Sequence, residues 1–159
     1  MGARRDPVEG EFVYEHPMEV RFVDTDAFGH VNNAVYLSYF EAARAGYYRA
    51  VTGAPFGTGE SAAERTFVIA EAHVVYRTPA FFGESLIVGC RFDWTGRSSF
   101  GLAYRVRAEA SVVGKERVVA DGESVQVMFD LTRGRAMRMP ADLLAQFEAF
   151  EGRAIPPRG

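Results

Sequence analysis

The sequence has one cysteine and one tryptophan among its 159 residues, and it has no long apolar run. Cys90 has no second cysteine for an internal disulfide, so we expect a reducing compartment. No segment approaches the roughly 20 apolar residues of a membrane-spanning helix, and residues 1–19 carry charges where a signal peptide would be apolar. These absences predict a cytoplasmic protein with no membrane segment.

The chain also lacks an excess of positive charge, since its formal net charge is −3 at pH 7. Nucleic-acid binding requires a basic surface that neutralises phosphates, so no nucleic-acid partner is expected. A few arginines are still enough for a small anionic ligand. The sequence contains no Cys-x-x-Cys pair, His-Glu-x-x-His motif, Gly-rich phosphate loop or nucleophile elbow. We therefore expect neither a metal nor another cofactor.

Length and periodicity predict a single domain over residues 17–152, preceded by a flexible arm over 1–16 and followed by a tail over 153–159. Alternating apolar residues predict a strand over 18–24, and spacings of three and four predict an apolar helix over 33–51. Punctuating turns then separate four more predicted strands, and a short helix is expected between Pro140 and Gly152. These strands are expected over 67–76, 86–94, 98–109 and 116–130.

Short turns favour antiparallel neighbours, so this order predicts an α+β fold. A five-stranded antiparallel sheet would wrap around one long central helix, with the short C-terminal helix beside it. The edges and second face of such a sheet would be exposed in a monomer. We therefore expect at least a homodimer, formed by pairing sheets edge to edge.

The segment VRFVDTDAFGHVNNAVYLSYFEAAR, residues 20–44, carries the candidate chemistry. It places Asp26 in a turn, seven residues before the expected helix start at Asn33. The first helical turn has unpaired N–H groups and the positive end of the helix dipole. A carboxylate beside such donors can attack a carbonyl, or activate a water molecule, while the donors stabilise the oxyanion. Gly29 would allow the tight turn between them.

Structural roles compete with the catalytic ones. Asp24 and Asp26 could each cap a turn, and Asn32 or Asn33 could cap the helix. His30 has no nearby serine or cysteine nucleophile and no second ligand at metal spacing, so positioning the loop competes with proton transfer as its role.

The element order and the motif DTDAFGHVNNAVYLSYFEAAR resemble the hotdog-fold thioesterases of the 4-hydroxybenzoyl-CoA thioesterase type. YRTPAFFGESL, DWTGRSSF and MPADLLAQFEAF are similar to later segments of that family, so the resemblance covers residues 18–150. It implies a hotdog fold and hydrolysis of acyl-CoA thioesters to a free acid and coenzyme A. Asp26 would be the nucleophile or the general base. The backbone N–H of Asn33, together with that of Ala34, would polarise the carbonyl. The Gly-His-Val-Asn-Asn version of the motif is more similar to the branch that acts on medium or long acyl chains.

The resemblance also suggests binding residues. Tyr36 would line the acyl pocket or pack across a dimer. A partner chain would add pocket walls, and turn arginines would hold the coenzyme A phosphates unless they are merely solvated charges. The candidates for the walls are Phe67, Val68 and Ile69, and those for the phosphates are Arg97, Ser98, Arg135 and Arg138, with Arg77 and Arg133 as further possibilities.

Three alternatives stay open at this point. The substrate could be an acyl carrier protein thioester, or the domain could bind acyl-CoA without turning it over. The 13% aromatic content fits an aryl or an aliphatic acyl group. The oligomer could be a dimer or a tetramer built from hotdog dimers.

Overall fold

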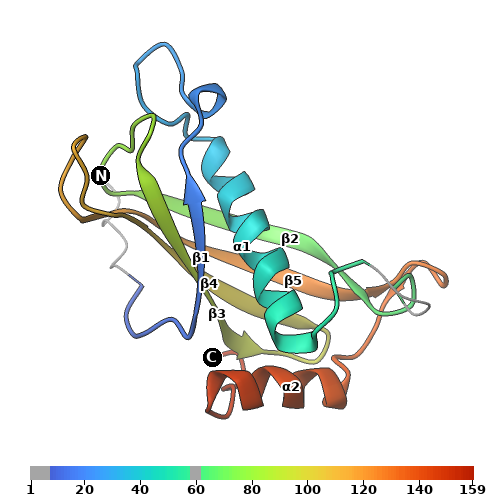
Figure 1. The fold of residues 1–159 in the computed structure, drawn as a ribbon. Helices are drawn as coiled ribbons and strands as arrows, with labels where there is room; N and C mark the ends of the chain where they lie inside the picture. The colour runs from blue at the N-terminus through green and yellow to red at the C-terminus, as the bar shows by residue number, and fades with distance from the viewer. Residues whose placement is uncertain (1–7, 58–61) are drawn as a thin grey trace.

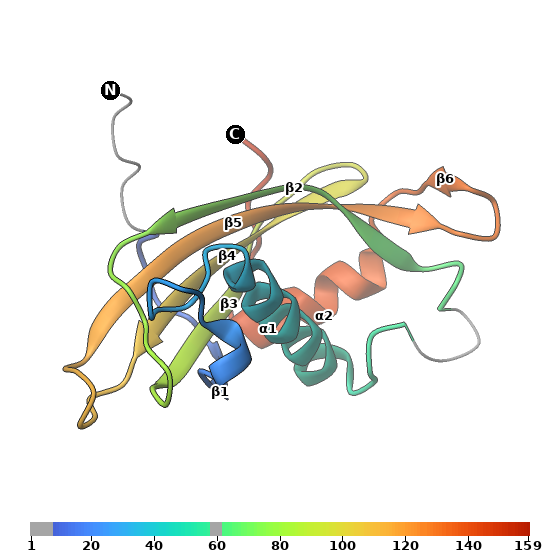
Figure 2. The same cartoon turned by 90° about the horizontal axis from the view of Figure 1, so that it is seen from above.

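The computed structural model describes residues 8–57 and 62–159, and it confirms the predicted α+β architecture. One long helix lies against a curved antiparallel sheet, and a shorter helix lies at one end (Figures 1 and 2). The elements are β1 (Tyr14–Glu19), the 3-10 turn η1 (Phe22–Asp24), α1 (Val35–Thr52), β2 (Thr66–Tyr76), β3 (Ser85–Thr95), β4 (Ser99–Ala108), β5 (Arg117–Asp130), β6 (Arg135–Ala136) and α2 (Ala141–Glu151).

The strand order is β1-β3-β4-β5-β2, and every described pair is antiparallel. The five predicted strands are present, and a two-residue strand, β6, that the sequence did not predict pairs with β5. β1 and β2 form the two edges. Figure 2 shows the sheet arching over α1, so one face of the sheet covers the helix.

The core lies between this face and α1. In β3, Leu86, Val88, Cys90 and Phe92 alternate along the strand and are fully buried, as expected when one strand face meets a helix. The buried residues of α1 recur at helical spacing: Tyr36, Tyr39, Phe40, Ala43 and Tyr47. The helix approaches β5 closely at Gly122, because this residue has no side chain. A Cβ there would lie 2.2 Å from a ring atom of Phe40 on α1. Neither helix of the described residues is long and apolar enough to cross a membrane.

The N-terminal strand lies earlier in the chain than the predicted 18–24. β1 begins at Tyr14, so residues 14–16 of the predicted arm belong to the sheet. The chain leaves the strand before Phe22 because the Asp24 carboxylate accepts the Arg21 N–H at 2.9 Å and closes a tight turn. The spacing of apolar residues carries no information about such a side-chain hydrogen bond, so it does not predict where the strand ends. Residues 1–7 of the predicted arm, and residues 58–61 between the predicted helix and the strand over 67–76, lie outside the described residues.

The last described part of the predicted arm packs on the outer face of the sheet. The Phe12 ring lies over Gly89, where a Cβ would be 2.5 Å from it, and the Arg91 guanidinium lies 5.1 Å from the ring centroid. Phe12 and Arg91 thus hold this segment against β3.

The connection from β2 to β3 is held by a buried ion pair. Glu84 is fully buried, and its two oxygens accept hydrogen bonds from Arg117 at 2.8 and 2.7 Å. Glu84 also accepts the Phe81 N–H at 2.9 Å, and Arg117 donates to the Pro79 carbonyl at 2.8 Å. Hydrogen bonds from Arg117, opposed by burial, keep the pKa of Glu84 below its ordinary value. The pair therefore fixes the connection to the start of β5.

We predict that Glu84→Gln lowers the free energy of unfolding by about 3 kcal/mol at pH 7, because it breaks a buried pair. The folded-state pKa of Glu84 is lowered, so its contribution is present above the unfolded-state pKa of about 4.3 and is lost as the pH falls through the folded-state value. The difference between wild type and variant should therefore shrink on acidification. Urea unfolding at pH 7 and at low pH measures both effects.

Glu116→Gln is the matched control, because the Glu116 side chain is 66% exposed and lies 3.5 Å from Arg107. It should change the free energy of unfolding by less than about 0.5 kcal/mol. Equal stability of Glu84→Gln and wild type at pH 7 would contradict the assignment.

Candidate active site

The first aspartate of the DTD motif, Asp24, anchors the segment between β1 and α1. Its carboxylate is buried and accepts hydrogen bonds from the Arg21 guanidinium at 2.8 Å and the Tyr39 hydroxyl at 2.9 Å. Its backbone carbonyl accepts the Asn32 N–H at 2.8 Å. Burial alone would raise the pKa of Asp24, but the hydrogen bonds from Arg21 and Tyr39 outweigh it and leave the pKa below its ordinary value. Asp24 is thus an ionised anchor with a structural role, as the capping alternative predicted.

The second aspartate, Asp26, begins a tight loop that ends at Val31. The Asp26 N–H donates to the His30 carbonyl at 3.1 Å, and the Gly29 N–H donates to the Asp26 carbonyl at 3.0 Å. Gly29 has φ +81°, a conformation that favours glycine, as the predicted tight turn requires. One carboxylate oxygen of Asp26 accepts the Phe28 N–H at 2.9 Å. Within the described chain no hydrogen bond engages the other oxygen, and the residue is half-buried.

The helix begins at Val35, two residues later than predicted. The reason is that Asn32 caps the preceding turn, where its side-chain oxygen accepts the Ala34 N–H at 2.9 Å. The Ala34 N–H is therefore not free to polarise a carbonyl, which corrects that part of the prediction. Among residues 8–57 and 62–159, no acceptor pairs with the Asn33 N–H, whereas the Asn33 carbonyl accepts the Tyr76 hydroxyl at 2.7 Å.

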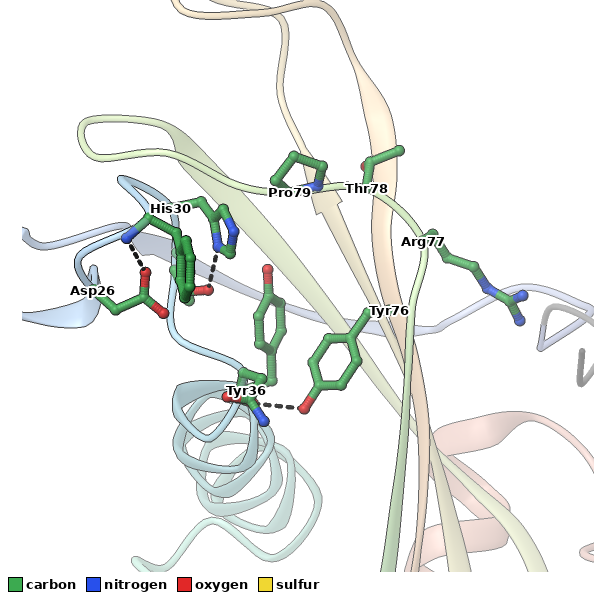
Figure 3. Close-up of a pocket in the computed structure, with 10 residues that line it drawn as sticks. Asp26, His30, Tyr36, Tyr76, Arg77, Thr78 and Pro79 are labelled. Carbon is green, nitrogen blue, oxygen red and sulfur yellow. Dashed lines mark hydrogen bonds between the residues drawn. The ribbon is translucent and has the colours of Figure 1, made fainter.

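A cavity of about 590 Å³ lies between this loop and the end of β2 (Figure 3). One wall comes from the loop and the first turn of α1, and the other comes from β2 and the connection after it. The lining residues are Asp26, Phe28, His30, Val31, Asn33, Tyr36, Tyr76, Arg77, Thr78 and Pro79.

Four of the predicted site residues, Asp26, His30, Asn33 and Tyr36, line this cavity, and Gly29 lies in the same loop. The Nδ1 atom of His30 lies 3.1 Å from the Val31 carbonyl. A carbonyl only accepts, so Nδ1 carries a proton and orients the ring within the loop.

The predicted binding residues other than Tyr36 and Arg77 lie toward the opposite end of β2. Phe67, Val68 and Ile69 are at the start of that strand, whereas Tyr76 at its end contacts the cavity. Arg97 is joined to the segment before α2 because its carbonyl accepts the Met139 N–H at 2.9 Å. Ser98 lies beside Arg97, and its carbonyl accepts a backbone N–H of β5 at 2.8 Å.

This end of the sheet has a second cavity of about 420 Å³, whose basic lining residues are Arg65, Arg133, Arg135 and Arg138. The structure thus gathers three of the predicted arginines, Arg133, Arg135 and Arg138, but not near Asp26 of the same chain, and neither Arg97 nor Ser98 lines this second cavity. β2 has 11 residues, so its two ends are about 33 Å apart at the usual rise per strand residue.

The sequence analysis missed two lining residues of the loop, Phe28 and Val31, and three at and just after the end of β2, which are Tyr76, Thr78 and Pro79. The Tyr76 hydroxyl bonds to Asn33, which is 43 positions away in the sequence, so local periodicity carries no sign of the contact. The sequence feature that could have indicated Tyr76, Thr78 and Pro79 is the Tyr-Arg-Thr-Pro segment at the end of the strand. Arg77, a lesser candidate for phosphate binding, points away from the cavity in Figure 3 and pairs with Asp121 at 3.0 Å.

Among the described residues, no group of three or more His, Cys, Asp or Glu side chains is arranged to hold a metal ion.

Comparison with known proteins places this geometry in context. Residues 20–147 match the model of the thioesterase-like superfamily. A thioesterase from Thermus thermophilus, solved in complex with coenzyme A and Zn, is 33% identical, with a TM-score of 0.72 and coverage of 89% of this chain and 96% of that one.

Two further solved structures share the fold. A predicted thioesterase from Bacillus stearothermophilus is 23% identical, covers 92% of this chain and 98% of its own, and has a TM-score of 0.72. A mutant 4-hydroxybenzoyl-CoA thioesterase in complex with 4-hydroxybenzoyl-CoA is 19% identical, covers 84% and 96%, and has a TM-score of 0.74. At these identities the similarity supports the fold and leaves the specific type untested.

The N-cap residue of α1 is Ala34, without a side-chain hydrogen bond of its own, and the Asn32 side chain that holds the turn before the helix gives a test of the local geometry. Asn32→Ala removes the acceptor of the Ala34 N–H, and we expect it to lower the free energy of unfolding by about 1 kcal/mol. Asn32→Asp keeps the acceptor and adds charge at the positive end of the helix, so it should be as stable as wild type. Thermal and urea unfolding of the two variants measure this difference. If both variants lose stability equally, Asn32 acts through packing and not as a cap.

Proposed function

The chain belongs to the thioesterase-like superfamily and is a thioesterase, and we propose that it hydrolyses acyl-CoA thioesters to a free acid and coenzyme A at the cavity beside Asp26. The observation that carries this proposal is that Asp26 and Asn33 line one cavity, with one Asp26 carboxylate oxygen and the Asn33 backbone N–H both left without a hydrogen-bond partner by the described residues. Thioester hydrolysis requires these two functions, a nucleophile or base and a donor for the developing oxyanion.

Two routes fit the Asp26 carboxylate. In the first, it attacks the thioester carbonyl carbon, the C–S bond breaks, and a mixed anhydride forms while the coenzyme A thiolate leaves. Water then hydrolyses the anhydride and restores the carboxylate. In the second, Asp26 takes a proton from a water molecule that attacks the carbonyl directly. In both routes the Asn33 N–H donates to the oxyanion, and the Tyr76 hydroxyl holds the Asn33 backbone in place.

Asp26→Asn should lower kcat/KM by roughly 10³-fold or more, because it removes the nucleophile or base while keeping the shape of the side chain. The measurement is thiol release from acyl-CoAs that range from benzoyl to palmitoyl. Circular dichroism and the melting temperature should match wild type. Asp93→Asn is the control, because that carboxylate of β3 is 41% exposed, pairs with Arg91 and does not line the cavity.

If Asp26→Asn hydrolyses acyl-CoA as fast as wild type, Asp26 is structural. If wild type is inert on the whole panel, the domain binds acyl-CoA without catalysis. Single turnovers in H₂¹⁸O separate the two routes, since label in the Asp26 carboxylate indicates the anhydride.

We also propose that the working unit contains a second copy of this chain, paired along β2. Within the described residues, β2 pairs only with β5, so its other edge presents free backbone donors and acceptors. Apolar side chains on and near this edge are exposed: Leu37 is 47% exposed, Val68 41%, Ile69 44% and Tyr76 45%. Edge pairing of two copies would bury this surface.

Such pairing would also bring the distant arginines into use. The roughly 33 Å between the two ends of β2 exceeds the reach of coenzyme A from Asp26 to Arg135 and Arg138 of the same chain. Two antiparallel β2 strands would place the start of the partner's strand beside the end of this one. The partner's arginine cluster would then lie near this cavity, where guanidinium groups suit the coenzyme A phosphates.

Mixed dimers test this arrangement. The double variant Arg135→Ala/Arg138→Ala should raise KM for acyl-CoA about tenfold or more, since each arginine loses charge-assisted hydrogen bonds. Refolding it together with Asp26→Asn should restore wild-type KM at one site of each mixed dimer, which is about a quarter of all sites after random pairing. A high KM at all of the active sites, which are the half that retain Asp26, would show that the arginines serve their own chain. A monomer in sedimentation would overturn the pairing itself.

A further inference from the structure

The buried tyrosines fall into two groups, according to whether the side-chain hydroxyl has a hydrogen-bond partner among the described residues. Tyr36, Tyr39, Tyr47 and Tyr104 are each at most 3% exposed. The hydroxyls of three of them form hydrogen bonds within the protein. Tyr39 donates to Asp24, Tyr47 donates to Glu151, and Tyr104 is paired with Ser124.

The Tyr36 hydroxyl differs from these three, because it has no hydrogen-bond partner in the part of the chain that the structure describes. Although the residue is 3% exposed, its hydroxyl oxygen is not sealed off: among the described residues, the buried side-chain polar atom without a partner is Nε of Arg91. The Tyr36 residue lines the cavity instead, so its hydroxyl is available to a ligand there.

The Tyr36 ring is fixed by its neighbours. It packs edge-to-face against Tyr39, with centroids 5.7 Å apart, and against Tyr76, with centroids 5.3 Å apart. The hydroxyls of both neighbours are themselves held by hydrogen bonds. Figure 3 shows the ring rising from α1 into the cavity, between His30 and the β2 wall. The hydroxyl is therefore presented at a defined place without reorganisation.

The depth of Tyr36 indicates which part of a substrate it meets. Phe28 is 85% exposed and Asp26 is only half-buried, so the reacting groups are near the mouth of the cavity. Tyr36 is 3% exposed and lies deeper. Coenzyme A is too large and too charged to pass the reacting carbonyl into a cavity of about 590 Å³. The part of the substrate that goes beyond the carbonyl is the acyl group.

We infer that the Tyr36 hydroxyl donates a hydrogen bond to an oxygen of the acyl group, and that the enzyme prefers oxygen-bearing acyl groups to the matching hydrocarbons. This inference rests on the proposed function, whose substrate class it narrows. The preferred substrates carry a hydroxyl, keto or phenolic oxygen in addition to the thioester carbonyl. A cavity that presents one such donor disfavours analogues without an acceptor, because their binding removes water from the donor and leaves it unpaired.

The protonation state of Tyr36 is suited to this role. Burial, with a smaller contribution from Tyr76, raises the pKa of Tyr36 to about 12. The hydroxyl therefore keeps its proton throughout the neutral range and acts as a donor there.

The experiment compares Tyr36→Phe with wild type on pairs of acyl-CoAs that differ by one oxygen. Suitable pairs are benzoyl with 4-hydroxybenzoyl, and hexanoyl with 3-hydroxyhexanoyl. Wild type should have the higher kcat/KM on at least one oxygenated member. Tyr36→Phe should lower that value by about five- to tenfold, the range expected for one neutral hydrogen bond, and change the hydrocarbon member less than about twofold.

Tyr48→Phe is the matched control. Tyr48 is a half-buried tyrosine of the same helix, its ring contacts Phe56 and Phe147, and it does not line the cavity. This variant should leave both rates and their ratio unchanged. An equal loss on both members of each pair with Tyr36→Phe would overturn the inference, because Tyr36 would then act on the common thioester or on water.

Binding separates this inference from the proposed function. Calorimetry measures the Kd of the same pairs for Asp26→Asn and for the double variant Asp26→Asn/Tyr36→Phe. A preference for the oxygenated member that disappears with Tyr36→Phe supports the inference even if hydrolysis is absent in wild type. Catalysis that depends on Asp26, together with identical Kd ratios in the two variants, retains the proposed function and rejects the role of Tyr36.

Discussion

The site depends on the buried carboxylate of Asp24. Its hydrogen bonds from Arg21 and Tyr39 join the chain after β1 to the first turns of α1. The loop that carries Asp26 is suspended between these two anchored ends, and the Asn32 N–H bonded to the Asp24 carbonyl fixes where the loop returns. An ionised group at 2% exposure is tolerated because every contact is a charge-assisted or hydroxyl hydrogen bond. The two aspartates of the DTD motif thus have different roles: Asp24 holds the loop, and Asp26 lines the cavity.

The opposite wall of the cavity is fixed by separate interactions. Glu84 and Arg117 hold the connection after β2, which carries Thr78 and Pro79. Tyr76 joins the two walls through its hydroxyl bond to the Asn33 carbonyl. The cavity therefore has polar supports behind both walls, whereas its own surface is mainly aromatic and apolar. Such support is what a site needs if its donors are to be positioned before the substrate arrives.

The fold separates the Asp26 cavity from the basic surface. The cavity beside Asp26 is at one end of β2, and the arginine-lined cavity is at the other end. The two cavities of one chain are too far apart for the proposed substrate to span, whereas the proposed symmetric pair joined along β2 would bring them together. The edge of β2 that no described strand pairs with, and the exposed apolar side chains of β2, favour the same pairing.

The sequence alone determined the α+β architecture, the long apolar helix and the loop that carries Asp26, Gly29 and His30. These features are local, since periodicity and turn chemistry express them within about 25 neighbouring residues. Only the tertiary structure decided which donor at the helix start is free, because the Asn32 side chain takes the Ala34 N–H and leaves that of Asn33. It also brought Tyr76 to the site, through the register of β2 on β5 and the packing of α1, and within the described residues it left the Tyr36 hydroxyl without a partner. Contacts between residues that are tens of positions apart are set by how buried surfaces fit together, and no local pattern in the sequence specifies them.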